Sequence, residues 1–337
     1  MTAPAPQVAT DIAAGARRIS VAPMMGCTDR HDRYLLRLIT RRALLYTEML
    51  SEQALIRGDH ARLLAFDPAE RPLALQIGGS DPEAMADGSE IAQAWGFDEI
   101  NINVGCPSKR VRAGRFGACL MAEPERVAAC VAAMRARVGV PVTVKTRLGI
   151  DDRDSVAELF RFVEIVADAG CDTFIVHARK AWLDGLSPRE NRTVPPLRYD
   201  WVYALKRQHP SLTVVVNGGV RTRADVHRHL GEGVDAVMIG REAYANPYSL
   251  AGVDQEFFGV KDASRTRRDI LTAYMDYCER QLSAGCRLNL LTRHVIGLFQ
   301  GQPNSRAWRR YLSEHAHRTG AGIEVIRAAA EHVCAPL

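Results

Sequence analysis

The stretch VTVKTRLGIDDRDSVAELFRFVEIVADAGCDTFIVHAR, residues 142–179, contains the unit that decides the fold. It begins with a short run rich in β-branched residues, VTVKTR (142–147), and ends with a second, TFIVHAR (173–179). Between these runs, Asp154 and Ser155 precede an amphipathic segment that stops at Gly170, a pattern typical of a capped helix. A strand, a helix and a second strand in this order predict two parallel strands joined by a crossover helix.

The same alternation continues along the chain on both sides of this unit. Further apolar runs are ISVAPM (19–24), LLYTEM (44–49), LALQIG (73–78), EININV (99–104), TVVVNGG (213–219) and AVMIGR (236–241). Helix starts follow several of them, as at Asp81-Pro82, Glu123-Pro124 and Thr222. Eight strands within about 225 residues predict a closed (β/α)8 TIM barrel. An open doubly wound sheet is the alternative, but the first strand–helix junction lacks the G-x-G-x-x-G fingerprint.

The strand pattern ends near residue 260, and the rest of the chain reads as helices. We expect them over roughly 264–284, 287–299, 305–317 and 322–333, from their apolar periodicity and the breaks between them. The sequence therefore predicts a disordered leader (1–17), a barrel (18–258) and a C-terminal small helical-bundle domain (259–337).

Composition sets the broad class of the protein. The chain has 337 residues, of which 47% are hydrophobic and 25% are charged, as in ordinary globular proteins. No apolar run approaches the roughly 18 residues of a membrane span, and the N-terminus lacks a secretory signal, so we expect a cytoplasmic protein. The net charge of +5 permits a polyanionic partner without requiring one. None of the eight cysteines form a CxxC pair, so we expect no metal, no disulfide, and mostly buried thiols.

Polar residues occur at the carboxyl ends of most predicted strands, where a TIM barrel carries its active site. A barrel held by packing alone would not place them inside apolar strands, because each needs a partner when buried. These residues are Glu48, Gln76, Asn101, Asn103, Lys145, Arg147, His177, Arg179 and Asn217.

The last two strands end in sequences that suggest a phosphate site. Asn217 is followed by Gly218 and Gly219, which let backbone N–H groups approach a ligand closely. Gly240 is followed by Arg241, which adds a positive charge. Barrels commonly hold phosphate at these two loops beside a short extra helix, which YANPYSLAG (244–252) can supply.

A phosphate site combined with Lys145, Gln76 and His177 suggests flavin mononucleotide (FMN). Lys145 suits the electron-rich N1/O2 edge of a reduced flavin, and Gln76 offers both a donor and an acceptor to its pyrimidine edge. A sugar phosphate and pyridoxal phosphate are the competing ligands, the latter with Lys145 as a Schiff-base lysine.

The segment NVGCPSKRVRAGRFGACLM (103–121) contains three glycines and predicts a mobile loop over the barrel mouth. Cys106 lies between Gly105 and Pro107, and four cations that follow it make the loop basic: Lys109, Arg110, Arg112 and Arg115. Such a setting can bring the pKa of a thiol towards neutrality, which is useful for a proton donor. The alternative is a buried cysteine in a glycine turn.

Several motifs together resemble the tRNA-dihydrouridine synthases. NxNVGCP, VTVKTRLG, IVHAR, NGG and MxGRxA occur in this order, with an APM opening and GRFGACLM. The segments at 177–197 and 297–312 look like those of the A subfamily. The resemblance implies FMN as cofactor, NADPH as reductant, and reduction of the C5=C6 bond of D-loop uridines, at positions 20 and 20a, to 5,6-dihydrouridine. It implies that reduced FMN gives a hydride to C6, and that Cys106 protonates C5.

The resemblance also assigns three groups of binding residues. The FMN-binding residues are Pro23, Met24, Met25, Gln76, Lys145, His177, Asn217, Gly218, Gly219, Gly240 and Arg241. The residues expected to orient the uracil are Asn103, Arg147 and Arg179. The residues expected to bind tRNA are Arg189, Arg192, Arg306 and Arg309. The expected macromolecular partner is tRNA, with no DNA and no membrane, and the protein is expected to act as a monomer.

The sequence around Arg306 supports this assignment independently. Ser305 predicts a helix N-cap, so Arg306 lies in the first turn, where a cation opposes the helix dipole. Arg309 is three residues further on, and Arg310 adds to the cluster. Such a cluster is favourable opposite a phosphate; the alternative is a solvated arginine face.

Two other functions fit part of the pattern. A flavin barrel acting on a small molecule, like dihydroorotate dehydrogenase, shares the phosphate site and a loop cysteine but does not explain the arginine-rich helical tail. A non-catalytic tRNA-binding barrel explains the tail but does not need Cys106, Lys145 and His177.

Overall fold

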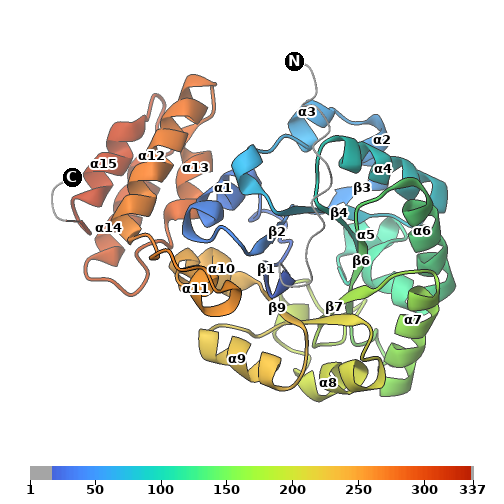
Figure 1. The fold of residues 1–337 in the computed structure, drawn as a ribbon. Helices are drawn as coiled ribbons and strands as arrows, with labels where there is room; N and C mark the ends of the chain where they lie inside the picture. Colours follow the sequence, from blue (N-terminus) through green and yellow to red (C-terminus); the bar gives the residue numbers. More distant parts are fainter. Residues whose placement is uncertain (1–16, 335–337) are drawn as a thin grey trace. The chain divides into compact units, whose positions relative to one another are not determined.

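The computed structural model describes residues 17–334, and its first feature is a closed parallel barrel (Figure 1). The barrel closes because β2 pairs with both β1 and β4, while β1 also pairs with β9. The two-residue strand β3 pairs with the end of β4. The strands are β1 (Ile19–Val21), β2 (Leu44–Tyr46), β3 (Leu50–Ser51), β4 (Leu73–Gly78), β5 (Glu99–Val104), β6 (Val142–Arg147), β7 (Thr173–His177), β8 (Thr213–Asn217) and β9 (Ala236–Ile239). The predicted (β/α)8 barrel is confirmed.

Helices surround the barrel strands and begin where the sequence places caps. Asp81 accepts a hydrogen bond from the N–H of Ala84, and Ser155 and Thr222 each form a capping box. Gly170, with φ of +102°, follows the end of α7 as predicted. Figure 1 shows α4, α6, α7, α8 and α9 around the strands. The helices of this part are α2 (Glu52–Arg57), α3 (His60–Leu63), α4 (Pro82–Ala94), α5 (Lys109–Ala113), α6 (Pro124–Arg137), α7 (Val156–Asp168), α8 (Tyr199–Gln208) and α9 (Arg223–Gly231), with 3-10 turns at Gly117–Ala122 (η3) and Glu190–Arg192 (η4).

The described chain divides into two compact units. The first contains the residues up to Met24, Leu44–Phe66 and Arg71–Gly240; the second contains Met25–Ala43, Asp67–Glu70 and the residues from Arg241 onward. The helices of the second unit are α1 (Arg30–Ile39), α10 (Arg241–Ala245), α11 (Val253–Phe258), α12 (Arg267–Ser283), α13 (Leu288–Val295), α14 (Ser305–His315) and α15 (Ile323–Ala330), with 3-10 turns η2 (Pro68–Glu70) and η5 (Pro247–Leu250). The predicted domain boundaries remain a prediction, and residues 1–16 of the predicted leader lie outside the described residues.

The second unit has its own core. Trp308 is fully buried, and its indole N–H donates to the carbonyl of Ile296 at 3.2 Å. The buried Arg33 guanidinium donates to the Glu70 carboxylate at 2.6 Å, so this internal charge has a partner. The four predicted C-terminal helices are present as α12 to α15.

Three local predictions are wrong. Asn304, not Ser305, is the N-cap of α14; its φ is +59°, a conformation that asparagine tolerates, and its side chain makes no capping bond. The loop at 103–121 contains α5 and the turn η3, because Ser108 caps a helix there. Only Cys130, Cys171 and Cys278 of the eight free cysteines are fully buried, whereas we expected most to be.

Within residues 17–334, no helix is long and apolar enough to cross a membrane.

Candidate active site

Alternate residues of β5 and β6 place polar side chains on one face of these buried strands. Asn103 pairs in register with Lys145, and Arg147 pairs with His177, which pairs with Asn217 on β8. Since side chains alternate across a strand, residues two apart share a face. The register therefore brings predicted site residues from four strands to the carboxyl end of the barrel.

Asn103 is held at both ends of its side-chain amide. Its Oδ1 accepts the backbone N–H groups of Gly105, at 3.1 Å, and Cys106, at 2.9 Å. Its Nδ2 donates to Oε1 of Gln76 at 2.7 Å. Asn103 therefore links a predicted flavin-binding residue to the backbone of the predicted acid.

Lys145 is partly buried, and its ammonium group donates to Oδ1 of Asn217 at 3.0 Å. Asn217 is fixed in turn, because its Nδ2 donates to the carbonyl of Met238 at 2.8 Å. Burial lowers the pKa of Lys145 to about 7; the nearby positive charge of Arg147 adds to this, and Cys106 opposes it. No described residue supplies a carboxylate to Lys145.

Arg147 is 4% exposed and joins two loops through backbone carbonyls. Its Nε donates to Gly105 at 2.8 Å, and its Nη1 donates to Lys180 at 3.1 Å and Asn191 at 2.9 Å. Its Nη2 bonds to none of the described residues. Burial lowers the pKa of Arg147 to about 10, so the guanidinium is still charged at neutral pH. It can hold the two loops and still offer N–H donors to a substrate.

Cys106 is partly buried at the start of the loop that follows β5. Its backbone is fixed on both sides, because its N–H donates to Asn103 and its carbonyl accepts from Ala118 at 2.9 Å. Lys145 and Arg147 both interact electrostatically with Cys106.

Three of the four loop cations are exposed, and the fourth has an acidic partner. Lys109, Arg110 and Arg115 are exposed, and Arg112 forms an ion pair with Asp184 at 2.6 Å. All four lie on or just after the short helix α5, which presents long charged side chains to solvent.

The two glycines after β8 are required by neighbouring side chains. Both have positive φ, +103° at Gly218 and +74° at Gly219. A Cβ at Gly218 would lie 2.5 Å from the ring of His177, and one at Gly219 would lie 2.5 Å from the hydroxyl of Tyr199. That hydroxyl donates to the carbonyl of Gly218 at 2.7 Å. The glycines thus keep His177 and Tyr199 packed against this turn, in addition to any role with a ligand.

The other predicted flavin-binding residues differ in exposure. Pro23 and Met24 are partly buried, and Met24 packs against the apolar core of the barrel. Met25 is 63% exposed. Gly240 follows β9, and Arg241 is exposed at the start of α10.

The third predicted uracil residue and two of the predicted tRNA residues lie in or near one loop. Arg179 donates to the carbonyl of Pro195. Arg189 and Arg192 are exposed on either side of the buried Asn191, in and next to the turn η4. The Asn191 side chain bonds to the backbone of Trp182 at 2.8 and 2.9 Å, which fixes the loop that presents the two arginines.

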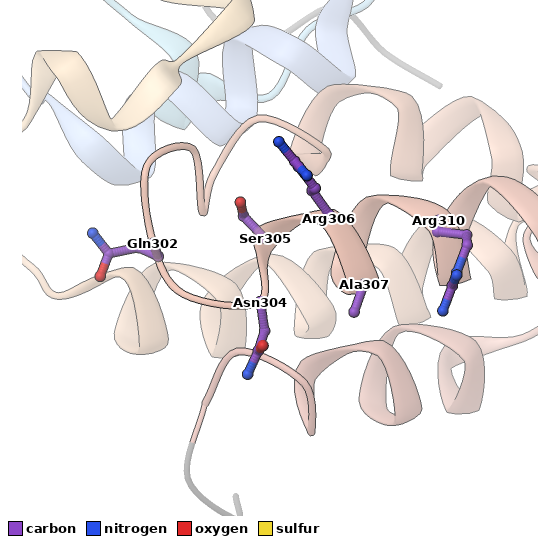
Figure 2. A pocket seen from close by; sticks show the side chains of 6 residues that line it. All are labelled: Gln302, Asn304, Ser305, Arg306, Ala307 and Arg310. Atoms are coloured by element: carbon purple, nitrogen blue, oxygen red, sulfur yellow. The ribbon is translucent and has the colours of Figure 1, made fainter.

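In the second unit, a pocket of about 510 Å³ lies at the N-terminal end of α14 (Figure 2). It is lined by Gln302, Asn304, Ser305, Arg306, Ala307 and Arg310. Figure 2 shows the Arg306 and Arg310 side chains extending in different directions from the helix. Arg309, which we predicted with Arg306, is partly buried and does not line the pocket.

Inside the barrel, three buried residues were not assigned a role from the sequence: Tyr46, Glu99 and Thr143. The carboxylate of Glu99 accepts hydrogen bonds from Thr143 at 2.7 Å and Tyr46 at 2.5 Å. The available signal is the alternation in EININV, where Glu99, Asn101 and Asn103 occupy every second position of a buried strand.

Comparisons with known proteins place the chain in one family. The family model described as Dihydrouridine synthase (Dus) matches residues 20–333. A tRNA-dihydrouridine(20/20a) synthase of Synechocystis is 54% identical over 311 residues, which is 92% of this chain and 93% of that protein. The proteins of the same name from Shewanella oneidensis and Vibrio cholerae are 54% and 55% identical, and each match covers at least 93% of both chains.

A solved structure supports the fold alone. A complex of 2-naphthoyl-CoA reductase superimposes with a TM-score of 0.53 over 71% of this chain and 50% of that chain, at 12% identity. At this identity the likeness extends to the architecture and not to the substrate.

Proposed function

The chain belongs to the dihydrouridine synthase family, and from that premise we propose which of its residues perform the reaction. It is an NAD(P)H-dependent oxidoreductase that reduces uridines in tRNA, and its family is flavin-dependent. We propose FMN as the flavin, NADPH as the reductant, and positions 20 and 20a of the D-loop as the target uridines. Cys106 is the proton donor in this proposal.

One observation carries the assignment of the site. Lys145 and Arg147 lie near Cys106 at the carboxyl end of the barrel, and no described residue pairs either cation with a carboxylate. Buried cations without an anionic partner are unfavourable, which agrees with the lowered pKa of Lys145. Such a site fits a bound group or a reaction that brings negative charge. A reduced flavin and a uracil gaining enolate character both do so.

The residues act on the uracil as follows. When bound, reduced FMN supplies the hydride that adds to C6. Arg147 directs Nη2 towards a uracil carbonyl and stabilises the negative charge that develops there. The Cys106 thiol transfers its proton to C5, which completes the saturated C5–C6 bond and leaves a thiolate that regains a proton from solvent. Asn103 and Arg179 complete the contacts to the base, which must leave its stack to reach the barrel mouth.

The cofactor contacts follow the predicted set. Lys145 meets the N1/O2 edge of the flavin, Gln76 meets its pyrimidine edge, and His177 lies beside it. Gly218, Gly219, Gly240 and Arg241 would hold the phosphate, and Pro23, Met24, Met25 and Asn217 would complete the set of flavin-binding residues. Support comes from Gln76, whose Nε2 and Oε1 each make one hydrogen bond inside the barrel and so each keep capacity for another.

Arginines outside the mouth bind the tRNA backbone in this proposal. Arg189 and Arg192 do so from the loop fixed by Asn191, and Arg306 and Arg309 do so from α14. The pocket at α14 supports an anion there, because its helix N-terminus lacks a side-chain cap and thus has unpaired N–H groups. Since Arg306 and Arg310 do not converge, the pocket suits an extended polyanion better than one small anion.

The decisive experiment compares Cys106→Ala with Cys119→Ala. Both cysteines are partly buried and lie in the same segment after β5. We expect the purified protein to be yellow and to convert uridines 20 and 20a in tRNA that lacks dihydrouridine. Cys106→Ala should lose this conversion while it keeps its flavin and its reduction by NADPH, whereas Cys119→Ala should stay active. Normal conversion by Cys106→Ala excludes Cys106 as the acid, and turnover of a free pyrimidine in place of tRNA would favour the small-molecule alternative.

A further inference from the structure

A continuous line of hydrogen bonds runs through the first unit from Glu99 to Cys106. Thr143 donates to Oε1 of Glu99 at 2.7 Å, and Nδ2 of Asn101 donates to Thr143 at 2.8 Å. Nε2 of Gln76 donates to Oδ1 of Asn101 at 2.8 Å, and Nδ2 of Asn103 donates to Oε1 of Gln76 at 2.7 Å. The line ends where Oδ1 of Asn103 accepts the N–H groups of Gly105 and Cys106.

The groups at the two ends of this line determine which atom donates and which accepts at every step between them. A carboxylate only accepts hydrogen bonds, so Thr143 must give its single proton to Glu99 and accept from Asn101. That orientation of Asn101 requires Nε2 of Gln76 to face it, and Oε1 of Gln76 then accepts from Asn103. The backbone N–H groups of Gly105 and Cys106 only donate, so they demand the same orientation of Asn103 from the other end.

Both oxygens of the Glu99 carboxylate accept hydrogen bonds. It is fully buried, and Oε2 receives a hydrogen bond from the Arg17 guanidinium at 2.8 Å. Oε1 accepts hydrogen bonds from the hydroxyl groups of Tyr46 and Thr143. Burial and the adjacent Glu99 carboxylate raise the pKa of Tyr46 well above its ordinary value, so Tyr46 stays a donor.

We propose that Glu99 is a positioning residue: through Thr143, Asn101, Gln76 and Asn103 it fixes the backbone of Cys106 and the orientation of the Gln76 amide. The role of Cys106 as acid rests on the proposed function, but the positioning itself does not. A carboxylate at the far end of β5 thus determines how the loop with the acid is held.

Glu99→Gln tests this order of donors and acceptors, because glutamine has nearly the same shape as glutamate but replaces one accepting oxygen with a donating nitrogen. An amide offers one accepting oxygen and one donating nitrogen, so it cannot accept from Arg17 on one side and from Thr143 on the other. Either a buried donor loses its acceptor, or the amides of Asn101, Gln76 and Asn103 reverse and expose the Cys106 N–H to another donor. Thr143→Val interrupts the same line one step later.

Two control variants keep the direction intact. Tyr46→Phe removes a different hydrogen bond to the same carboxylate, and Thr143→Ser retains the hydroxyl. The measurements on the purified protein are hydrogen exchange at the amides of Gly105 and Cys106, and the pH profile of Cys106 alkylation by iodoacetamide, read by peptide mass spectrometry. Neither depends on tRNA turnover, so they remain informative whether or not the proposed reaction is correct.

We expect Glu99→Gln and Thr143→Val to speed exchange of these two amides by about tenfold, as for the loss of one buried hydrogen bond. We expect both variants also to change the alkylation profile, because the thiol is no longer held beside Lys145 and Arg147. Thr143→Ser and Tyr46→Phe should match the wild type. The proposal is overturned if the first two variants behave as wild type, or if all four loosen the loop equally. If Glu99→Gln does not fold, the comparison of Thr143→Val with Thr143→Ser decides.

Discussion

Lys145 on β6 and Asn217 on β8, two strands that flank β7, form a 3.0 Å hydrogen bond, and it is the only polar contact to the Lys145 ammonium group from the described residues. An amide oxygen carries no net charge, so this contact only partly replaces the water that the cation loses on burial. The protein therefore holds a destabilised positive charge at the place where we propose a flavin. This cost is recovered when a negatively charged group binds.

The pH dependence of stability should reveal this buried amine. The pKa of Lys145 is about 7 in the folded chain and near 10.5 in the unfolded chain. Between these values the unfolded state binds more protons, so the contribution of Lys145 makes the cofactor-free protein more stable as pH rises. Relative to Lys145→Met, wild-type stability should increase by up to about 1.4 kcal/mol per pH unit from pH 7 to 10. Urea unfolding at several pH values measures this, with the exposed Lys261→Met as control. A pH-independent difference would contradict the lowered pKa.

Arg147→Lys should loosen two loops at once. Lysine keeps the charge but cannot reach the carbonyls of Gly105, Lys180 and Asn191 together, because its donors diverge from a single nitrogen. We expect a loss of about 2 kcal/mol in unfolding free energy and faster hydrogen exchange at residues 105–120 and 180–192. The control is Arg126→Lys, whose exposed partner Glu123 lies outside both loops, so neither the unfolding free energy nor the exchange in these loops should change. If Arg147→Lys leaves exchange in one of the loops unchanged, Arg147 does not join them.

The strands could be predicted from the sequence because their signal is local. The bounds of β5 and β6 coincide with EININV and VTVKTR. Each of these six-residue runs contains its own strand signal, which consists of β-branched residues and an alternation of period two. The contacts of Arg147 could not be predicted, since Lys180 and Asn191 lie 33 and 44 residues away and meet it only after the loops fold. The cap of α14 was misplaced because Asn304 and Ser305 both suit the position, and the left-handed backbone at Asn304 decides between them.

Gly218→Ala should disturb His177 and destabilise the barrel. The new methyl group would lie 2.5 Å from the imidazole ring, and alanine is strained at a φ of +103°. We expect a loss of about 2 kcal/mol or more in unfolding free energy and a reduced flavin content. Gly231→Ala is the control, because this glycine lies in α9 with open space around its Cβ. It should stabilise the protein slightly, by about 0.5 kcal/mol. A tolerated Gly218→Ala would show that the turn has more freedom than its packing indicates.

The arginines of α14 should differ in their contribution to tRNA binding. Arg306 and Arg310 line the pocket at the helix N-terminus, and no described residue forms an ion pair with either. A phosphate contact made by one of them releases counterions, so its loss reduces the dependence of affinity on salt. We expect Arg306→Gln and Arg310→Gln each to weaken binding and to lower the slope of log affinity against log salt by about 0.9 or less.

Arg309→Gln tests whether tRNA contacts the residue assigned by the family resemblance or only the arginines that line the pocket. The family resemblance assigns a tRNA contact to Arg309, yet its side chain is partly buried outside the pocket. A slope change equal to that of Arg306→Gln means that tRNA covers both sides of α14. An unchanged slope means that tRNA contacts only the pocket, and that Arg310 is the second tRNA-binding arginine of α14 in place of Arg309. The control is Arg207→Gln on α8, an exposed arginine that is outside every site proposed for RNA. If Arg207→Gln weakens binding as much as the α14 variants, the effect is one of net charge and the assignment of these arginines fails.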